Sequence, residues 1–192
     1  MKKIILFTAL AMFAFTTVSA QGINVGAKAG LNLASVNGDD TDDVDGRTAF
    51  HVGGVVNIEI SELFAVQPEI VYSAQGFTQN VDLGDLGSFE STARLDYINI
   101  PVLADITLIE GLSLQGGPQF GINVTSEVEV NGETGELDGI ESLDIAAAIG
   151  AQYELPMGLF FQLRYVTGLT EIAEGGNVKN TNLSVSAGWF FL

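Results

Sequence analysis

The 192-residue chain contains no cysteine, one histidine and only seven basic residues. The absence of cysteine excludes a disulfide framework, a thiolate metal site, a cysteine nucleophile and a lipid-modified N-terminal cysteine. Because His51 is the only histidine, a cluster of histidine metal ligands is excluded as well. The 24 acidic residues outnumber the basic ones and give a formal net charge of −17, which repels phosphate backbones. We therefore expect no nucleic-acid partner.

Long apolar runs are missing after residue 20, and no later segment reaches the 18 apolar residues typical of a membrane-spanning helix. The first 20 residues instead have the order of a secretory signal peptide. Lys2 and Lys3 precede an apolar run over 4–15, and Val18-Ser19-Ala20 forms a small-residue cleavage site. The run is too short for a membrane span. We expect residues 1–20 to be removed, which leaves a single mature domain, 21–192.

The mature chain alternates between apolar and polar residues with period two, the pattern of a strand with two different faces. Near its start, Leu31 and Leu33 share one face, while Lys28, Gly30 and Asn32 share the other. The alternation predicts eight strands, over 23–33, 50–60, 66–75, 98–106, 112–124, 144–155, 159–165 and 182–191.

The two faces differ in charge and in volume. Seven charged residues of these strands fall on the face with small and polar side chains, and none on the apolar face: Lys28, Glu59, Glu69, Asp105, Asp144, Glu154 and Arg164. A charge facing lipid costs about 2 to 4 kcal/mol at the bilayer midplane. The apolar face also carries too many aromatic rings for the narrow interior of an eight-stranded barrel. The apolar face is therefore predicted to face lipid.

The connections alternate between long ones (35–47, 78–96, 125–143, 170–180) and short ones (61–63, 107–111, 156–158). Short periplasmic turns and long external loops are typical of outer-membrane barrels, and closure removes unpaired strand edges from lipid. The sequence thus predicts an eight-stranded antiparallel up-and-down transmembrane β-barrel in the outer membrane. The alternative is a soluble barrel with its apolar face inward, which would be extracted without detergent.

Chemical motifs are few. The chain has no G-x-S-x-G, no P-loop and no H-E-x-x-H. The acidic run 39–46 does not fit an EF-hand, because aligning Gly46 with the loop glycine places Thr41 at the first ligand position and Val52 where a glutamate is needed. We expect no catalytic residue, no resident metal and no cofactor. The acidic loops, which include Glu127 and Glu133, are expected to form a hydrated outer surface, with divalent cations bridging it to lipopolysaccharide as a hypothesis.

Three charged residues are predicted to meet inside the barrel. Glu69 and Arg164 lie at similar depths in strands on opposite sides, with Lys28 nearby. They could line a gated polar path, or they could form a paired network in a filled interior, which the narrow barrel favours. In the second case Arg164→Ala is expected to destabilise the barrel more than Glu69→Gln, because it would leave several carboxylates without a cation. His51 is expected to be a packed, hydrogen-bonded interior residue.

Several segments in order resemble the PorT-like outer-membrane β-barrel domain proteins, often labelled "porin family". They include Gly30-Leu31-Asn32, FHVGG at 50–54, FAVQPEIVYSAQG at 64–76, LDYINIPVL at 95–103, GPQFG at 117–121, FQLRY at 161–165 and GWFF at 188–191. The resemblance covers essentially the whole mature chain and implies location and architecture, with no catalytic residues. Many such barrels end on an aromatic residue that the barrel-insertion machinery reads. Here Leu192 is last and Phe191 precedes it.

We therefore expect an integral, non-enzymatic outer-membrane protein with a filled polar interior, acting structurally or through its acidic loops. Its expected partners are outer-membrane lipid, lipopolysaccharide and, through the C-terminal strand, the insertion machinery. The sequence names no protein partner. A small-solute channel and an accessory component of a protein-secretion apparatus remain as alternatives.

Overall fold

The structure is a computed structural model that describes residues 22–38, 44–82, 88–130, 132–137, 139–173 and 177–191. Nine strands are found in this part of the chain: β1 (Ile23–Asn37), β2 (Val44–Ser61), β3 (Phe64–Asp82), β4 (Ser88–Ile109), β5 (Leu112–Val130), β6 (Glu133–Glu136), β7 (Leu143–Glu154), β8 (Leu159–Gly168) and β9 (Lys179–Phe190). No helix among the described residues is long and apolar enough to cross a membrane.

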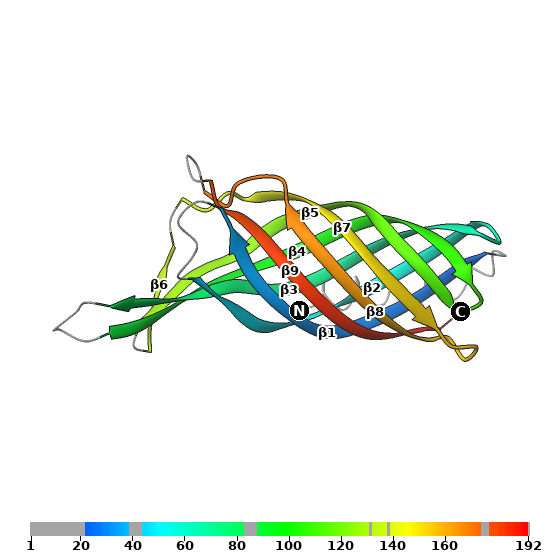
Figure 1. The fold of residues 1–192 in the computed structure, drawn as a ribbon, viewed down its shortest axis with the longest axis horizontal. Coiled ribbons are helices and arrows are strands. Elements are labelled where there is room, and N and C mark those ends of the chain that lie inside the picture. The colour runs from blue at the N-terminus through cyan, green and yellow to red at the C-terminus, as the bar shows by residue number, and fades with distance from the viewer. Residues whose placement is uncertain are drawn as a thin grey trace, which may run out of the picture.

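Eight of the strands form a closed barrel (Figure 1). Each pairs antiparallel with its chain neighbours, β5 pairing with β7, and β9 pairs with β1 from Gly26↔Phe190 to Asn37↔Lys179. Closure leaves no open strand edge along the ring, which matters in lipid because no water is there to satisfy backbone groups. The eight-stranded antiparallel barrel predicted from the alternation is confirmed.

The two faces of the strands are distributed as predicted. Leu31 is 60% exposed on the outside, whereas its neighbour Asn32 is 1% exposed on the inside. The large aromatic side chains of the apolar face also point outward: Phe50, Phe64, Phe120, Tyr153, Phe161, Tyr165, Trp189 and Phe191. An inward apolar face, as in a soluble ligand-binding barrel, does not occur in the described strands.

The two ends of the barrel differ in their connections. At one end, which we call the turn end, residues 62–63, 110–111 and 155–158 join consecutive strands, so the short connections are confirmed. We call the opposite end the loop end. In outer-membrane barrels the short turns lie in the periplasm and the longer connections outside the cell. Both chain ends of the barrel, near Ile23 and Phe190, lie at the turn end.

Much of the chain predicted as long loops is in fact strand. The β3–β4 pairing continues to Asp82↔Ser88, and β5 continues to Val130, where it pairs with the additional short strand β6. This paired sheet projects beyond the barrel at the loop end (Figure 1). Antiparallel pairing continues past the membrane because each further ladder bond satisfies backbone groups, and outside lipid either face tolerates polar residues. The apolar alternation used for prediction stops at the membrane boundary, so it missed these extensions.

Candidate functional site

The barrel interior brings the three predicted charged residues into direct contact. Arg164 on β8 reaches across to Glu69 on β3 with two parallel hydrogen bonds, Nη1 to Oε2 and Nη2 to Oε1, both 2.7 Å. Lys28 Nζ on β1 lies 2.7 Å from the same Oε2. All three side chains are at least 96% buried. We call these residues the charge cluster. It contains two cations and one carboxylate, so its formal charge is +1.

A layer of glutamine amides lies beside the charge cluster on its turn-end side. Gln162 accepts a hydrogen bond from Lys28 Nζ at 2.8 Å and donates to Gln115 at 2.7 Å. Gln67 donates to Glu69 at 2.9 Å and to Gln152 at 3.3 Å. Asparagine and glutamine can donate and accept at once, so this layer links strands β1, β3, β5, β7 and β8 without adding charge. The polar alternation predicted which residues face inward, and the structure supplies their pairing.

Asp105, a buried carboxylate on β4, does not belong to the charge cluster. Its Oδ2 accepts hydrogen bonds from Ser113 Oγ at 3.1 Å and from Gln115 Nε2 at 2.6 Å. No salt bridge joins it to a described cation. Arg164 therefore serves one carboxylate, not several as expected from sequence, and this changes the expected ranking of the charge variants.

His51 is packed and hydrogen-bonded in the interior, as predicted. It is 4% exposed, its Nδ1 lies 2.9 Å from Asn32 Oδ1, and its Nε2 lies 2.8 Å from Ser186 Oγ. Asn32 Oδ1 can only accept, so Nδ1 carries the proton and Nε2 accepts from the Ser186 hydroxyl. This arrangement links β2 to β1 and β9 and leaves neither ring nitrogen free for a metal.

An apolar layer lies at the loop end of the interior, and the sequence analysis did not predict it. Val36, Leu95, Tyr97 and Ile172 form a buried cluster, and further partly buried hydrophobic side chains from strands and connections pack against it: Val44, Phe77, Leu137, Ile140 and Val178. The hydroxyl of Tyr97 accepts a hydrogen bond from Asn180 Nδ2 at 3.1 Å. Extending the alternation upstream from Asn99 would have placed Leu95 and Tyr97 inward, so the signal was present in the sequence.

A second interior feature missed from sequence lies toward the turn end. The rings of Phe160 and Phe190 pack with their centroids 4.7 Å apart, and Val55 joins them in a buried cluster. The Phe160 ring lies against Gly188, where a Cβ would overlap the ring atoms. Both phenylalanines occupy inward positions of their strands, next to Gln162 and Gly188, and alternation alone would have found them.

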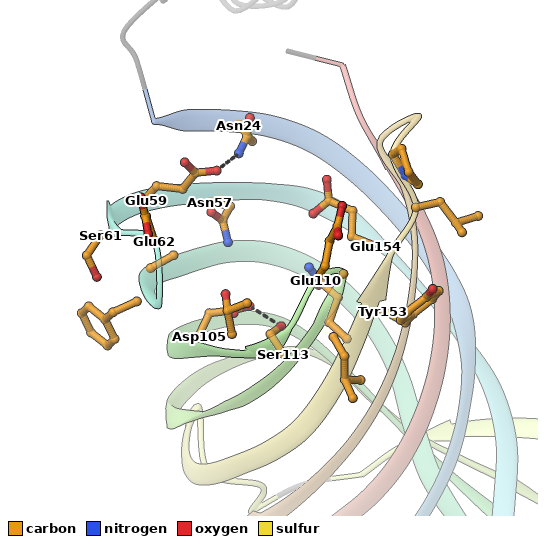
Figure 2. A pocket seen from close by; sticks show the side chains of 18 residues that line it. Asn24, Asn57, Glu59, Ser61, Glu62, Asp105, Glu110, Ser113, Tyr153 and Glu154 are labelled. Atoms are coloured by element: carbon orange, nitrogen blue, oxygen red, sulfur yellow. Dashed lines mark hydrogen bonds between the residues drawn. The ribbon is translucent and has the colours of Figure 1, made fainter.

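The turn end opens into an acidic cavity of about 650 Å³ (Figure 2). Its walls include Glu59, Glu62, Asp105, Glu110 and Glu154, and the lining contains no Lys or Arg. Glu59 accepts a hydrogen bond from Asn24 Nδ2 at 2.9 Å. The floor of the cavity is formed by interior polar residues, including Gln152 and Ser113, so the cavity ends before the charge cluster.

Metal-binding groups are not assembled among the described residues. No set of three or more His, Cys, Asp or Glu side chains there has the arrangement to hold a metal ion. Of the acidic run 39–46 that we tested against the EF-hand, residues 39–43 lie outside the described residues, and 44–46 begin strand β2. At the loop end, Arg94 pairs with Glu129, and both side chains are partly exposed.

Comparison with known proteins gives one family and several structural relatives. The model of the family described as outer membrane protein beta-barrel domain matches residues 19–174. Among solved structures, Neisserial surface protein A superposes with a TM-score of 0.60 at 13% identity, covering 89% of this chain and 100% of that one. The attachment invasion locus protein Ail of Yersinia pestis gives a TM-score of 0.57 at 15% identity, covering 88% and 99%. No curated protein matches the chain.

At these identities the structural likeness supports the fold alone, whereas the family match spans most of the chain. The lipid-compatible outer face, the closed ring and the family match lead to the same conclusion. The chain belongs to the outer membrane protein beta-barrel domain family and is an integral protein of the outer membrane.

Proposed function

We propose that this protein is a sealed outer-membrane barrel with a structural role in the envelope or a role in contacts made through its external loops. One observation carries this proposal: Glu69 is held by Arg164 from the opposite side of the interior and by Lys28 from β1. These contacts occupy the middle of a barrel whose width is only just filled by side chains. The apolar layer at the loop end supports the same interpretation. We propose no enzymatic role.

A sealed interior predicts that the purified protein forms no conducting pore. Wild-type protein inserted into a planar lipid bilayer should give no current steps above the baseline at physiological salt, because the charge cluster and the apolar layer both block passage. Glu59→Gln, at the exposed turn end, is the matched control and should behave in the same way. Reproducible unitary steps from wild-type protein would support the small-solute channel instead.

The external surface is proposed as the place of interaction with lipopolysaccharide. Described acidic residues Glu133, Glu136 and Glu141 are exposed beyond the barrel, and divalent cations favour such carboxylates. If cations bridge this surface to lipopolysaccharide, a chelator should release bound lipopolysaccharide from wild-type protein and have less effect on a Glu133→Gln/Glu136→Gln/Glu141→Gln variant. Identical release from both proteins would contradict the bridging hypothesis.

Processing and assembly follow from the same proposal. We infer that residues 1–20, which lie outside the described residues, are cleaved on export, so N-terminal sequencing of the membrane-bound protein should begin at Gln21. A start at Met1 would contradict this.

We also propose that β9, with Phe191 exposed just after it, is the segment read by the insertion machinery.

Within its family, we propose that the chain is PorT-like, on the order and spacing of the segments quoted above. This leaves an accessory role in protein secretion as the second candidate. Deletion of the gene separates the two: normal protein export with altered envelope integrity supports the structural role, and blocked export supports the secretion role.

A further inference from the structure

The acidic cavity at the turn end gathers negative charge from several parts of the barrel. Five carboxylates line it: Glu59 on β2, Asp105 on β4, Glu154 on β7, and Glu62 and Glu110 in two of the turns. Figure 2 shows these side chains around one opening. Because the strands belong to a closed ring, the barrel holds carboxylates from distant parts of the chain around the same space.

Asp105 is a buried carboxylate that faces this cavity without a cation. It is 4% exposed and forms part of the cavity wall. Its two hydrogen bonds, from Ser113 and Gln115, both go to Oδ2, and both come from neutral groups. Neutral donors and water satisfy hydrogen bonds but supply no opposite charge, and buried charges in proteins are normally paired. The cavity therefore contains a buried negative charge that the described chain leaves without a counter-charge.

The carboxylates near Asp105 have no cation either. Glu154 is close enough to Glu59 and Asp105 to be repelled by both. Within the described part of the chain, every salt bridge is made by Glu69 or Glu129, and the cavity lining contains no Lys or Arg. Walls of a single charge sign around a recess concentrate the electric field there and attract ions of the opposite sign. The cavity should therefore attract a cation.

The arrangement of the carboxylates favours an extended organic cation over a metal ion. No three acidic side chains in the described ranges are placed to hold one metal ion. Carboxylates on separate strands instead match a ligand whose positive charges are spaced along its length. The volume of about 650 Å³ lies in the range of small-molecule sites, about 300 to 1,000 Å³. The lining also contains Ala65, Leu112 and Leu155, which suit the methylene segments of an aliphatic chain.

We propose that the turn-end cavity binds a linear aliphatic polyamine, whose ammonium groups pair with Glu59, Asp105 and Glu154. Its methylene segments lie against the apolar part of the lining. Since short turns face the periplasm in outer-membrane barrels, the ligand enters from the periplasm. The cavity ends before the charge cluster, so binding requires no passage through the barrel and does not depend on what the external loops contact.

Calorimetric titration of spermidine into the full mature protein in phosphatidylcholine nanodiscs tests this proposal. Both ends of the barrel are accessible there, and the lipid carries no net charge. At physiological salt we expect saturable binding of one spermidine per barrel, with little displacement by an equal concentration of Mg²⁺. Absence of saturable binding, or ready displacement by Mg²⁺, would overturn the proposal. Saturable binding of trilysine without any binding of spermidine would overturn it as well, in favour of a basic protein segment.

Two double variants locate the site. Glu59→Gln/Glu154→Gln should weaken spermidine binding roughly tenfold, because each neutralised carboxylate removes one ion pair. The matched control Asp45→Asn/Glu171→Gln removes the same charge at the loop end and should bind spermidine as the wild type does. Equal weakening in both variants would show diffuse attraction to an acidic protein and contradict a defined site.

A measurement on the wild type keeps the proposal testable if Glu59→Gln/Glu154→Gln does not fold. In NMR spectra of the nanodisc sample, spermidine should shift the backbone amide resonances of turn-end residues such as Gly111 and Glu154. Resonances at the loop end should stay in place. Shifts confined to the loop end would overturn the proposal.

Discussion

Glu69→Gln is expected to destabilise the barrel by about 3 to 5 kcal/mol, the usual cost of breaking a buried ion pair by removing one partner. Glu69 is the single carboxylate between Lys28 and Arg164. Without it, two buried cations remain next to each other with no counter-charge. The measurement is the free energy of unfolding of the protein refolded into lipid vesicles, from a denaturant titration.

The other two members of the cluster should rank below Glu69. Arg164→Gln leaves the Lys28–Glu69 pair and should have an intermediate effect, although the two-bond contact is lost. Lys28→Gln leaves the two-bond Arg164–Glu69 pair and a neutral cluster, so it should have the smallest effect. The control Glu59→Gln, at the exposed turn end, should change stability by no more than about 0.5 kcal/mol. A Lys28→Gln variant as unstable as Glu69→Gln would contradict this charge balance.

This ranking reverses the one expected from sequence. The alternation placed two cations, Lys28 and Arg164, and five carboxylates, including Glu69 and Asp105, on one face. Arg164 was therefore expected to be the critical residue. The structure shows Asp105 satisfied by Ser113 and Gln115 instead. Sequence can assign a side chain to the interior, but the depth and tilt of each strand decide which partner it meets.

Gly30→Ala is expected to destabilise the barrel strongly, by about 3 kcal/mol or more, the upper range for overpacking a tight site. A Cβ at Gly30 would overlap the carbonyl oxygen of Val185 and lie 2.8 Å from Ser186 Cα. Both are backbone atoms of β9, and they cannot move without opening the β1–β9 pairing that closes the barrel.

Gly54→Ala is the matched control for this prediction. Gly54 faces outward, and the nearest atom to an added Cβ is Gly26 O at 4.0 Å. We expect Gly54→Ala to fold with nearly wild-type stability, while Gly30→Ala shows a lower unfolding midpoint and a smaller folded fraction. Equal midpoints for the two variants would show that the β1–β9 pairing tolerates a side chain at Gly30.

The fold could be predicted from the sequence because a lipid-facing strand leaves a strong pattern. Alternating apolar residues, such as Leu31 and Leu33 on β1 or Phe50 and Val52 on β2, identified both the strands and their outward face. The pattern was informative only within the membrane, so the extensions of β3, β4 and β5 were missed. Leu95, Tyr97 and Phe160 were also missed as interior residues, because hydrophobic side chains on the polar face break the simple division between the two faces.

The sequence predicted which residues of the candidate site face the interior, but not which of them contact one another. Lys28, Glu69, Arg164 and His51 were all placed inside from alternation. The two-to-one ratio of cations to carboxylate in the charge cluster and the glutamine layer depend on strand register, which alternation does not specify.

The most direct test of the central claim is heat-modifiability of the protein extracted from the membrane fraction. A closed barrel with its apolar face in lipid should require detergent for extraction, and the unboiled sample should migrate differently from the boiled one on a gel. Protein that is released without detergent and migrates identically before and after boiling would contradict a closed membrane barrel with an outward apolar face.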